Sequence, residues 1–445
     1  MTQQGTIFAL ASARGRAGVA VIRISGPQSD AALQAFTKGR ALPSPRVTAL
    51  RRLTDPADQT ILDEALVLRF AEGASFTGES CVEIQCHGGS AVVSAILKCL
   101  GHLPDLRLAE PGEFTRRAFD HGQLDLVQIE GLADLIAAET EAQHRAAIRQ
   151  ADGSLGRMVK EWSTTLTKSC ALLEATIDFA DEDIPDSTFE AVSENVFHVK
   201  QSIQDLLENA TFSERFRDGW RIALIGSPNA GKSSLINALT RRDVAIISPI
   251  AGTTRDAIEV SLDLKGYPVT LIDTAGMRET DDVIETEGVA RTRKNAETAD
   301  LRIALASHDA PLSKEAMTLL NPDDLTVWNK SDLVATNGDE LQISAKTGEG
   351  LDHLIEQISQ RLDFSDPSDA SALLRDRHDA ALRESLAGLD RFAKLAEAPD
   401  SPVRDNPEIA AEHLRLARAA LGTITGDVGV ERLLDVIFSE FCLGK

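Results

Sequence analysis

A phosphate-loop signature constrains the fold of this chain more than any other feature. Residues 226–233 read GSPNAGKS and match the Walker A pattern G-x-x-x-x-G-K-[ST]. The apolar run RIALI at 221–225 predicts a buried strand, and SLINAL at 234–239 predicts the helix that follows it. In this context glycines let the backbone approach phosphate oxygens, Lys232 reaches the β- and γ-phosphates, and Ser233 binds magnesium. The sequence therefore predicts a P-loop nucleotide-binding domain.

Two further motifs each follow an apolar run. One is predicted to bind the phosphates with their magnesium, and the other to recognise the base. Asp273-Thr274-Ala275-Gly276 follows 269–272 and supplies a magnesium-binding Asp and a Gly that senses a γ-phosphate. Asn329-Lys330-Ser331-Asp332 follows 325–328. Asp332 can accept the two hydrogen bonds that guanine offers from N1–H and its 2-amino group, which adenine cannot offer. Guanine is therefore the predicted base.

The remaining two stretches complete the predicted site. Ser344-Ala345-Lys346 forms a base-binding rim, and 252–256 (GTTRD) places Thr254 near magnesium when a γ-phosphate is present. Together the five stretches resemble the translation-factor-type GTPases. The predicted GTP-binding residues are Asn229, Ala230, Gly231, Lys232, Ser233, Ser234, Ser248, Pro249, Ile250, Ala251, Gly252, Thr253, Thr254, Asp273, Thr274, Ala275, Gly276, Asn329, Lys330, Asp332, Ser344, Ala345 and Lys346.

Length and charge bound the possible partners. At 445 residues the chain is long enough for two or three domains. Five irregularly placed cysteines, with no signal peptide and no long apolar span, predict a cytoplasmic protein that does not enter a membrane. A net charge of −23 argues against an autonomous nucleic-acid binder. We expect any RNA substrate to be held with help from a basic partner.

The first 119 residues predict an α/β domain. Strands are expected at 18–26, 64–70 and 81–86, and helices at 29–36 and 90–100. Cys81, Cys86 and His87 could suggest a metal site, but alternation along the strand places the two cysteines on opposite faces. Two buried thiols are the favoured interpretation.

Helical periodicity dominates the rest of the chain outside the nucleotide-binding segment. It runs from Leu124 to about Ala210, interrupted by the acidic stretch 178–185, which we interpret as an exposed loop rather than a metal site. Helical spacing returns from Ala370. The predicted fold is multidomain, α/β and all-α. A helical domain made of 120–218 and 364–445 receives an inserted Ras-like P-loop GTPase domain at 219–363, after the α/β domain 1–119.

Several motifs outside the GTPase segment carry a resemblance that covers essentially the whole chain. They are GVAVIRISGP (18–27), FTGE (76–79) with Glu83 and HGG (87–89), PGEFTRRAF (111–119), LDL (124–126) and the terminal FCLGK (441–445). With these motifs the chain resembles the MnmE (TrmE) family of tRNA modification GTPases.

The resemblance implies a tetrahydrofolate-binding and dimerising N-terminal domain, and a homodimer. It also implies an FAD-containing MnmG-type partner with which the protein installs a (carboxymethyl)aminomethyl group at C5 of the wobble uridine of tRNA. A 5-formyl- or methylene-tetrahydrofolate would supply the carbon, and ammonium or glycine the nitrogen. The folate-binding positions implied are Arg23, Glu83, Gln123 and Lys445. Gln123 departs from the Lys of some members, so an ionic contact there becomes a neutral hydrogen bond.

Hydrolysis needs groups other than those of Ras. Met277 follows the Asp-x-x-Gly motif where Ras-like enzymes carry a water-orienting Gln, and Met cannot orient water. The resemblance implies Glu285, in the acidic stretch 279–287, as the general base beside Lys232. No arginine finger is evident; the resemblance implies a potassium ion held by the Asn229 side chain and by the carbonyls of Ser248, Ile250 and Thr253. Magnesium is assigned to Ser233 and Thr254, with Asp273.

The sequence leaves alternatives open for the role of Cys442 and for the function of the protein. Cys442 lies in the tail that resembles the folate pocket, so it could be a nucleophile or a packed thiol. Besides the tRNA-modifying GTPase, the sequence admits a regulatory ribosome-assembly GTPase switch and a folate-binding module with a vestigial GTPase. The segment before Asn329 also looks shorter than in some relatives, which predicts a trimmed surface connection.

Overall fold

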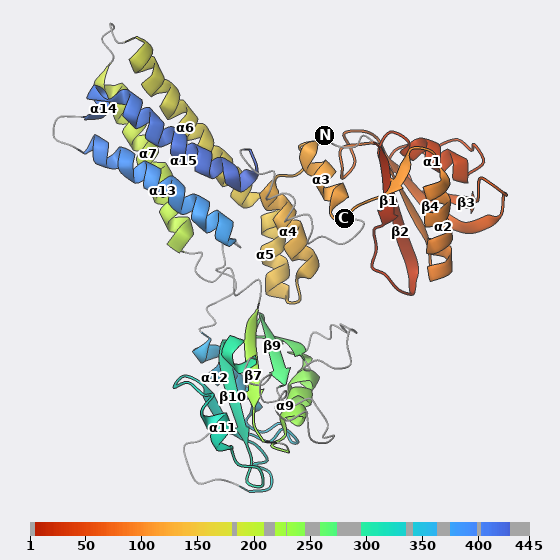
Figure 1. Cartoon of the computed structure of the whole chain (residues 1–445), viewed down its shortest axis with the longest axis vertical. Coiled ribbons are helices and arrows are strands. Elements are labelled where there is room, and N and C mark those ends of the chain that lie inside the picture. The colour runs from red at the N-terminus through yellow and green to blue at the C-terminus, as the bar shows by residue number, and fades with distance from the viewer. Residues whose placement is uncertain are drawn as a thin grey trace. The chain divides into compact units, whose positions relative to one another are not determined.

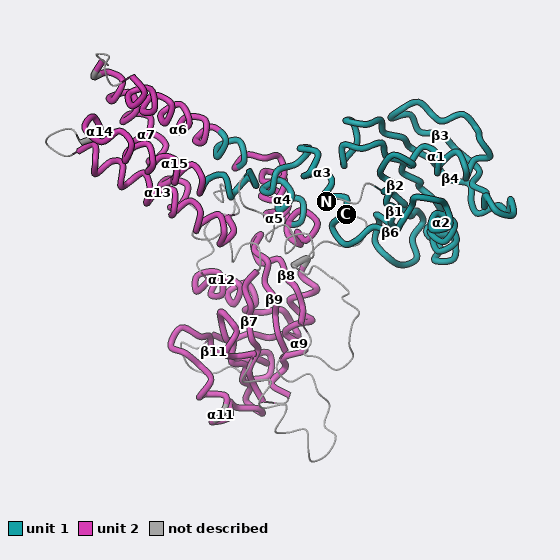
Figure 2. The backbone as a smooth tube through the Cα atoms, turned by 45° about the horizontal axis from the view of Figure 1, so that its top comes forward, with its two compact units in different colours: residues 1–133, 156–160, 421–445 teal, residues 134–155, 161–420 magenta. Residues whose placement is uncertain are grey.

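A computed structural model describes residues 5–179, 185–208, 219–227, 229–244, 259–273, 295–334, 341–362, 374–397 and 402–427. Backbone contacts divide the chain into two compact units, which Figure 2 colours separately. Unit 1 contains 1–133, 156–160 and 421–445, and unit 2 contains 134–155 and 161–420. No helix within the described ranges is both long and apolar enough to span a bilayer.

Unit 1 is built on a six-stranded sheet in the order β3-β4-β5-β2-β1-β6. Its elements are β1 Thr6–Leu10, β2 Ala17–Ser25, α1 Ser29–Phe36, β3 Ala49–Thr54, β4 Ile61–Phe70, β5 Cys81–Gly88, α2 Ser90–His102, β6 Leu106–Leu108, α3 Glu113–Asp120 and most of α4 Leu126–Ala137. Only β1 and β6 pair in parallel. The strands and helices expected from the sequence here are confirmed, whereas β1, β3 and β6 were missed.

The two faces of this sheet differ. Ile22, Val67 and Ile84 point to one face, where helices α1 and α2 bury them in a shared core. On the other face the structure leaves apolar side chains exposed, among them Leu50 and Leu66, which pair across β3 and β4. Strand alternation therefore puts Arg23 and Glu83 on the face that α1 and α2 do not cover.

The G segment of unit 2 contains a second six-stranded sheet, in the order β12-β11-β10-β7-β9-β8. Its elements are β7 Trp220–Ile225, α9 Lys232–Leu239, the π-helical turn η1 Thr240–Val244, β8 Glu259–Leu264, β9 Tyr267–Asp273, β10 Leu301–Ala306, the short helix α11 Lys314–Met317, β11 Leu325–Trp328, β12 Leu341–Gln342 and α12 Leu351–Arg361. All neighbours are parallel except β8 and β9. Because the sheet is parallel, the carboxyl ends of β7, β9, β10 and β11 share one edge, where the nucleotide motifs follow.

The helices of unit 2 confirm the expected helical periodicity. They are α5 Glu141–Ala151, α6 Ser154–Asp178, α7 Asp186–Glu208, α13 Asp376–Ala396, α14 Pro402–Asp405 and α15 Pro407–Thr425. Figure 1 shows α6, α7, α13 and α15 side by side, although the chain passes through the G segment between α7 and α13. Pieces distant in sequence thus form one helical assembly, as expected; the exact domain boundaries remain predictions.

Candidate functional site

The phosphate loop joins β7 to α9, and two of its glycines permit very close packing. A Cβ on Gly226 would lie 2.3 Å from the carbonyl oxygen of Leu305 in the neighbouring strand. Gly231 is the N-cap of α9 with φ +98°, and a Cβ there would lie 2.2 Å from Nδ2 of Asn329. Both distances are too short for any side chain. The loop is therefore packed directly against strand β10 and the guanine motif.

Lys232 is buried at the start of α9, with 5% of its surface exposed. Its Nζ donates to the carbonyls of Gly226, at 2.6 Å, and Ser227, at 3.1 Å. Burial lowers the pKa of this amine, and the nearby Asp273 carboxylate offsets part of that effect. A phosphate beside Lys232 favours the charged form, so the residue is placed to bind an anion.

Asn329 joins three of the predicted motifs. Its Nδ2 donates to the carbonyl of Ala230 in the phosphate loop, at 2.9 Å. Its Oδ1 accepts from the backbone N–H groups of Lys330, at 2.8 Å, and Ala345, at 3.0 Å. Since Asn329 is only 7% exposed, these bonds are shielded from water. The phosphate loop and the two base motifs therefore form one structure.

Asp332 is exposed at the rim, and Ser344 orients it. The Ser344 hydroxyl donates to Oδ1 of Asp332 at 2.7 Å and accepts from the N–H of Thr347 at 3.1 Å. The neighbouring Lys330 pairs with Asp309, through distances of 2.9 and 2.7 Å to its two carboxylate oxygens. Hydrogen bonds from Lys330 and then from Ser307 lower the pKa of Asp309 to about 2.

Asp309 lies in the connection between β10 and β11 that the sequence suggested was short. That connection contains a turn bridged between Ser307 and Ala310 and the four-residue helix α11. The carbonyl of Pro311 accepts a hydrogen bond of 2.7 Å from the Ser227 hydroxyl of the phosphate loop. The connection thus contacts both the phosphate loop and the guanine motif.

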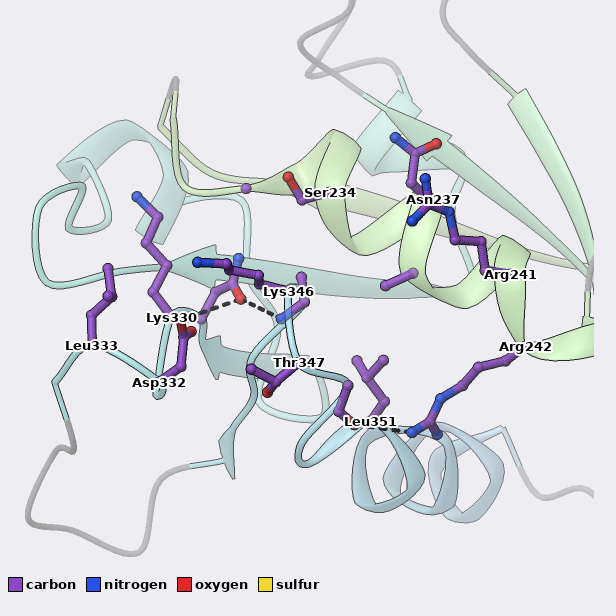
Figure 3. Close-up of a pocket in the computed structure, with 15 residues that line it drawn as sticks. Ser234, Asn237, Arg241, Arg242, Lys330, Asp332, Leu333, Lys346, Thr347 and Leu351 are labelled. Atoms are coloured by element: carbon purple, nitrogen blue, oxygen red, sulfur yellow. Dashed lines mark hydrogen bonds between the residues drawn. The ribbon is translucent and has the colours of Figure 1, made fainter.

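A cavity of about 640 Å³ opens between α9 and these base motifs. Figure 3 shows Ser234, Asn237 and Arg241 along one side, and Asp332, Lys346 and Thr347 on the other. The full lining is Gly231, Ser234, Asn237, Ala238, Arg241, Arg242, Asn329, Lys330, Asp332, Leu333, Ala345, Lys346, Thr347, Gly348 and Leu351. Its volume lies within the range usual for small-molecule sites.

The metal donors predicted from the sequence are partly described. Asp273 ends β9 and is 2% exposed, and Ser233 is exposed on the first turn of α9. A carboxylate and a hydroxyl are hard oxygen donors, so they fit magnesium. Asn229 lies in the phosphate loop at φ +69° with its side chain exposed, which suits an oxygen donor to a cation. Ser248, Pro249, Ile250, Ala251, Gly252, Thr253, Thr254, Thr274, Ala275, Gly276, Met277 and Glu285 lie outside the described residues.

In unit 1 the structure brings together two of the residues expected to bind folate, Arg23 and Glu83. Arg23 and Glu83 are cross-strand partners on β2 and β5, and Nε and Nη2 of Arg23 both contact Oε1 of Glu83, at 3.0 and 2.9 Å. The rings of Phe76 and Phe114 hold the guanidinium, with centroids 5.2 and 5.7 Å from Cζ. Gln123 packs close to Gly78, where an added Cβ would lie 3.3 Å from Cγ of Gln123, so it lies beside the loop that carries Phe76. Lys445 lies outside the described residues.

A buried charge network supports this cluster, and the sequence analysis did not find it. Arg117 is 7% exposed, and its Nη1 donates to both oxygens of Glu79 at 3.0 Å. Its Nη2 donates to the Gly5 carbonyl at 2.9 Å and to Glu113 at 3.0 Å. The only available signal was that two sequence motifs, FTGE and PGEFTRRAF, carry opposite charges. The network ties the loop with Phe76 to the helix with Phe114.

The described cysteines behave as buried thiols. Burial raises the pKa of Cys81 to about 12 and also raises that of Cys86. Across the described ranges no group of three or more His, Cys, Asp or Glu side chains is arranged to hold a metal. The buried-thiol interpretation of Cys81 and Cys86 is confirmed. Cys442 lies outside the described residues.

Comparisons with known proteins identify the family of this chain. The family model of the MnmE helical domain matches residues 126–442, and the model described as the N-terminus of the GTP-binding protein TrmE matches residues 6–123. The tRNA modification GTPase MnmE of Cereibacter sphaeroides is 48% identical over 99% of this chain and 100% of its own length. The human protein named 5-taurinomethyluridine-[tRNA] synthase subunit GTPB3, mitochondrial, is 45% identical over 99% of this chain and 93% of its own.

Two solved structures are similar to part of this chain. The G domain of the FeoB iron transporter of T. maritima is 26% identical and covers 32% of this chain and 98% of its own, with a TM-score of 0.24. An Aquifex aeolicus Era variant bound to GDP.AlF4- is 25% identical and covers 38% of this chain and 66% of its own, with a TM-score of 0.26. On the family models and the full-length relatives, the chain belongs to the MnmE family of tRNA modification GTPases.

Proposed function

We propose that this protein is a potassium-dependent GTPase that, with an FAD-containing MnmG-type partner, forms a (carboxymethyl)aminomethyl group at C5 of the wobble uridine of tRNA. A tetrahydrofolate derivative supplies the one-carbon unit. The observation that carries the nucleotide part of the proposal is the Asn329 side chain, which joins the phosphate loop to the guanine motif. The name of the human relative, a 5-taurinomethyluridine-[tRNA] synthase subunit, supports uridine as the modified base.

The chain's own groups hold the nucleotide at both ends. Asp332, oriented by Ser344, accepts from the guanine N1–H and 2-amino groups, and the Ala345 segment forms the rim beside it. At the other end Lys232 exchanges its carbonyl partners in the loop for phosphate oxygens, aided by the N-terminus of α9. Ser233, Thr254 and Asp273 would hold magnesium, which would neutralise charge on the phosphates.

Hydrolysis relies on Glu285 and on Asn229. Glu285 orients the attacking water and accepts its proton, since Met277 cannot. Asn229, with the carbonyls of Ser248, Ile250 and Thr253, would hold potassium when two G domains meet. A cation held by these residues would supply positive charge where negative charge develops between the β- and γ-phosphates.

The N-terminal cluster is proposed to bind folate. Both Arg23 contacts to Glu83 use Oε1, so Oε2 can accept from a ligand without breaking the pair. A carboxylate oxygen of this kind accepts from the N–H groups of a pterin, and Gln123 and Lys445 add polar contacts. The exposed apolar pair Leu50 and Leu66 on the uncovered face of the sheet supports a homodimer through this domain.

Two further elements of the proposal rest on charge and on family membership. The net charge of −23 favours a tRNA complex in which the MnmG-type partner supplies basic surface. We also propose a cytoplasmic location, because GTP, folate and tRNA, the ligands of the proposed reaction, are all available there.

The test is steady-state GTP hydrolysis by the full chain in potassium chloride and sodium chloride at matched ionic strength. We expect strong stimulation by potassium, lost in Asn229→Ala and in Glu285→Ala. Glu285→Ala should reduce hydrolysis about 100-fold or more with GTP binding retained, the usual effect of losing a general base. Glu279→Ala, in the same acidic stretch, is the matched control and should hydrolyse GTP normally. Equal rates in the two salts would contradict the ion assignment and favour a ribosome-assembly GTPase.

A further inference from the structure

Arg242 lies on the α9 side of the cavity and contacts the loop that carries the base-binding rim. It lies in η1, the turn that ends α9, and its side chain is about one-third exposed, at 32%. Nη1 pairs with Oδ1 of Asp352 at 2.5 Å, and Nη2 donates to the carbonyl of Gly348 at 3.0 Å. Figure 3 shows the side chain reaching from the end of α9 toward the first turn of α12. One guanidinium thus links two elements that enclose the cavity.

The segment that Arg242 holds is the loop that carries the rim, residues 344–350. Its first half is fixed by the guanine motif, through Ser344 to Asp332 and through the Ala345 N–H to Asn329. Its second half contains Gly348 at φ +86° and Gly350 at φ +76°. Glycines permit this path but do not restrain it, because they have more backbone freedom than other residues.

Local hydrogen bonds close the loop on itself. The N–H of Gly348 donates to the Ser344 carbonyl at 2.8 Å, and the N–H of Ser344 donates to the Glu349 carbonyl at 2.9 Å. These bonds define the turn but do not attach its second half to α9. Arg242 provides that attachment, with a cation that stays charged at any working pH.

We infer that Arg242 is a positioning residue for guanine recognition. By holding the Gly348 carbonyl and Asp352, it keeps the rim loop closed against the base, so that the Ala345 N–H and Asp332 stay aligned. It acts through the loop and does not touch the phosphates. This inference rests on the proposed guanine site and assigns to it a residue outside the sequence motifs.

The effect of removing Arg242 should depend on the base. In the full-length chain we expect Arg242→Ala to release a fluorescent GDP about five- to tenfold faster than wild type, the size expected for the loss of one ordinary hydrogen bond. Inorganic pyrophosphate has no base, so we expect it to bind at the phosphate loop without the base-binding rim. Its affinity, measured by competition, should be unchanged, whereas a general loss of structure would weaken both ligands.

Three variants sharpen the test. Arg242→Lys should recover part of the loss, since an ammonium can reach one partner but cannot span both. Asp352→Ala removes one of the two contacts and should release GDP faster than wild type but more slowly than Arg242→Ala. The matched control is Glu356→Ala, one turn further along α12, which removes a similar exposed ion pair to Lys265 away from the cavity. It should behave as wild type.

The outcomes separate the two proposals. If wild type binds GDP no better than ADP, the proposed guanine site itself is wrong. If wild type prefers GDP but Arg242→Ala releases it at the wild-type rate, the site stands and the role of Arg242 is overturned. Parallel loss of GDP and pyrophosphate affinity would also overturn it, because Arg242 would then support the whole segment.

Discussion

The nucleotide site and the N-terminal cluster are held together by different kinds of contact. Around the phosphate loop, Gly226 and Gly231 let backbone and a buried amide approach within distances that no side chain permits. In the N-terminal cluster, Arg23 and Glu83 pair across two strands between aromatic rings, above a network of buried charges. The nucleotide site should therefore lose ligand affinity when a side chain is added at one of its glycines. The N-terminal cluster should lose ligand affinity when one of its charged side chains is removed.

The largest effect should come from adding one methyl group at the phosphate loop. Gly231→Ala places a Cβ where Nδ2 of Asn329 now lies and forces a non-glycine residue to φ +98°. Strain of about 1–3 kcal/mol, added to the lost Asn329 contact, should weaken GDP binding about 100-fold or more. Isothermal titration with GDP measures it. Wild-type affinity in this variant would show that the close packing is not required.

The next effect should come from removing charge in the N-terminal cluster. Arg23→Ala leaves Glu83 without its cation and the two phenylalanine rings without their guanidinium. We expect the affinity for 5-formyltetrahydrofolate to fall about 10- to 100-fold, as for a lost hydrogen bond to a charged group. Arg52→Ala, an exposed arginine on β3, is the control and should bind normally. GDP binding should be unchanged in both variants.

Acid should loosen the N-terminal cluster by a smaller amount. Burial raises the pKa of Glu113, but hydrogen bonds from Arg107, the Glu110 N–H and Arg117 outweigh it and leave the pKa below its ordinary value of 4.5. The stabilisation is therefore complete above pH 4.5 and is lost as the pH falls through the folded-state pKa. Hydrogen-exchange protection factors of peptides covering α3 should stay constant from pH 7 to about pH 4.5 and fall at lower pH. Glu113→Gln should show less pH dependence; equal dependence would contradict this role.

The smallest effect should come from the connection between β10 and β11. Ser227→Ala removes the hydrogen bond to the Pro311 carbonyl at a half-buried position. A loss of about 0.5 kcal/mol, or roughly twofold in GDP affinity, is expected for one such bond. Stopped-flow GDP release would detect it. A tenfold change would mean that this connection controls the phosphate loop more strongly than its geometry suggests.

The sequence predicted the chemistry of each site better than its assembly. Strand β7, helix α9 and the guanine motif follow from local patterns, because an apolar run and a glycine-rich turn specify them over a few residues. Strand β6, with three residues, is too short to show a pattern. The pairing of Arg23 with Glu83 depends on the register of strands 60 residues apart, which tertiary packing sets.

The sequence also did not predict contacts that a single side chain makes with residues far away along the chain. Asn329 was expected as a base-motif residue, but its bond to the Ala230 carbonyl joins positions 99 residues apart. Arg242 matches no motif and gains its contacts only when the turn η1 meets the start of α12 and the loop before it. Such contacts depend on three-dimensional proximity, so one sequence does not reveal them.

The most direct test of the account is a double titration of the full chain with GDP and 5-formyltetrahydrofolate, on wild type, Gly231→Ala and Arg23→Ala. We predict that wild type binds both ligands, that Gly231→Ala loses only GDP, and that Arg23→Ala loses only the folate. Loss of both ligands in either variant, or failure of wild type to bind one of them, would contradict the claim that two separately assembled sites serve this GTPase.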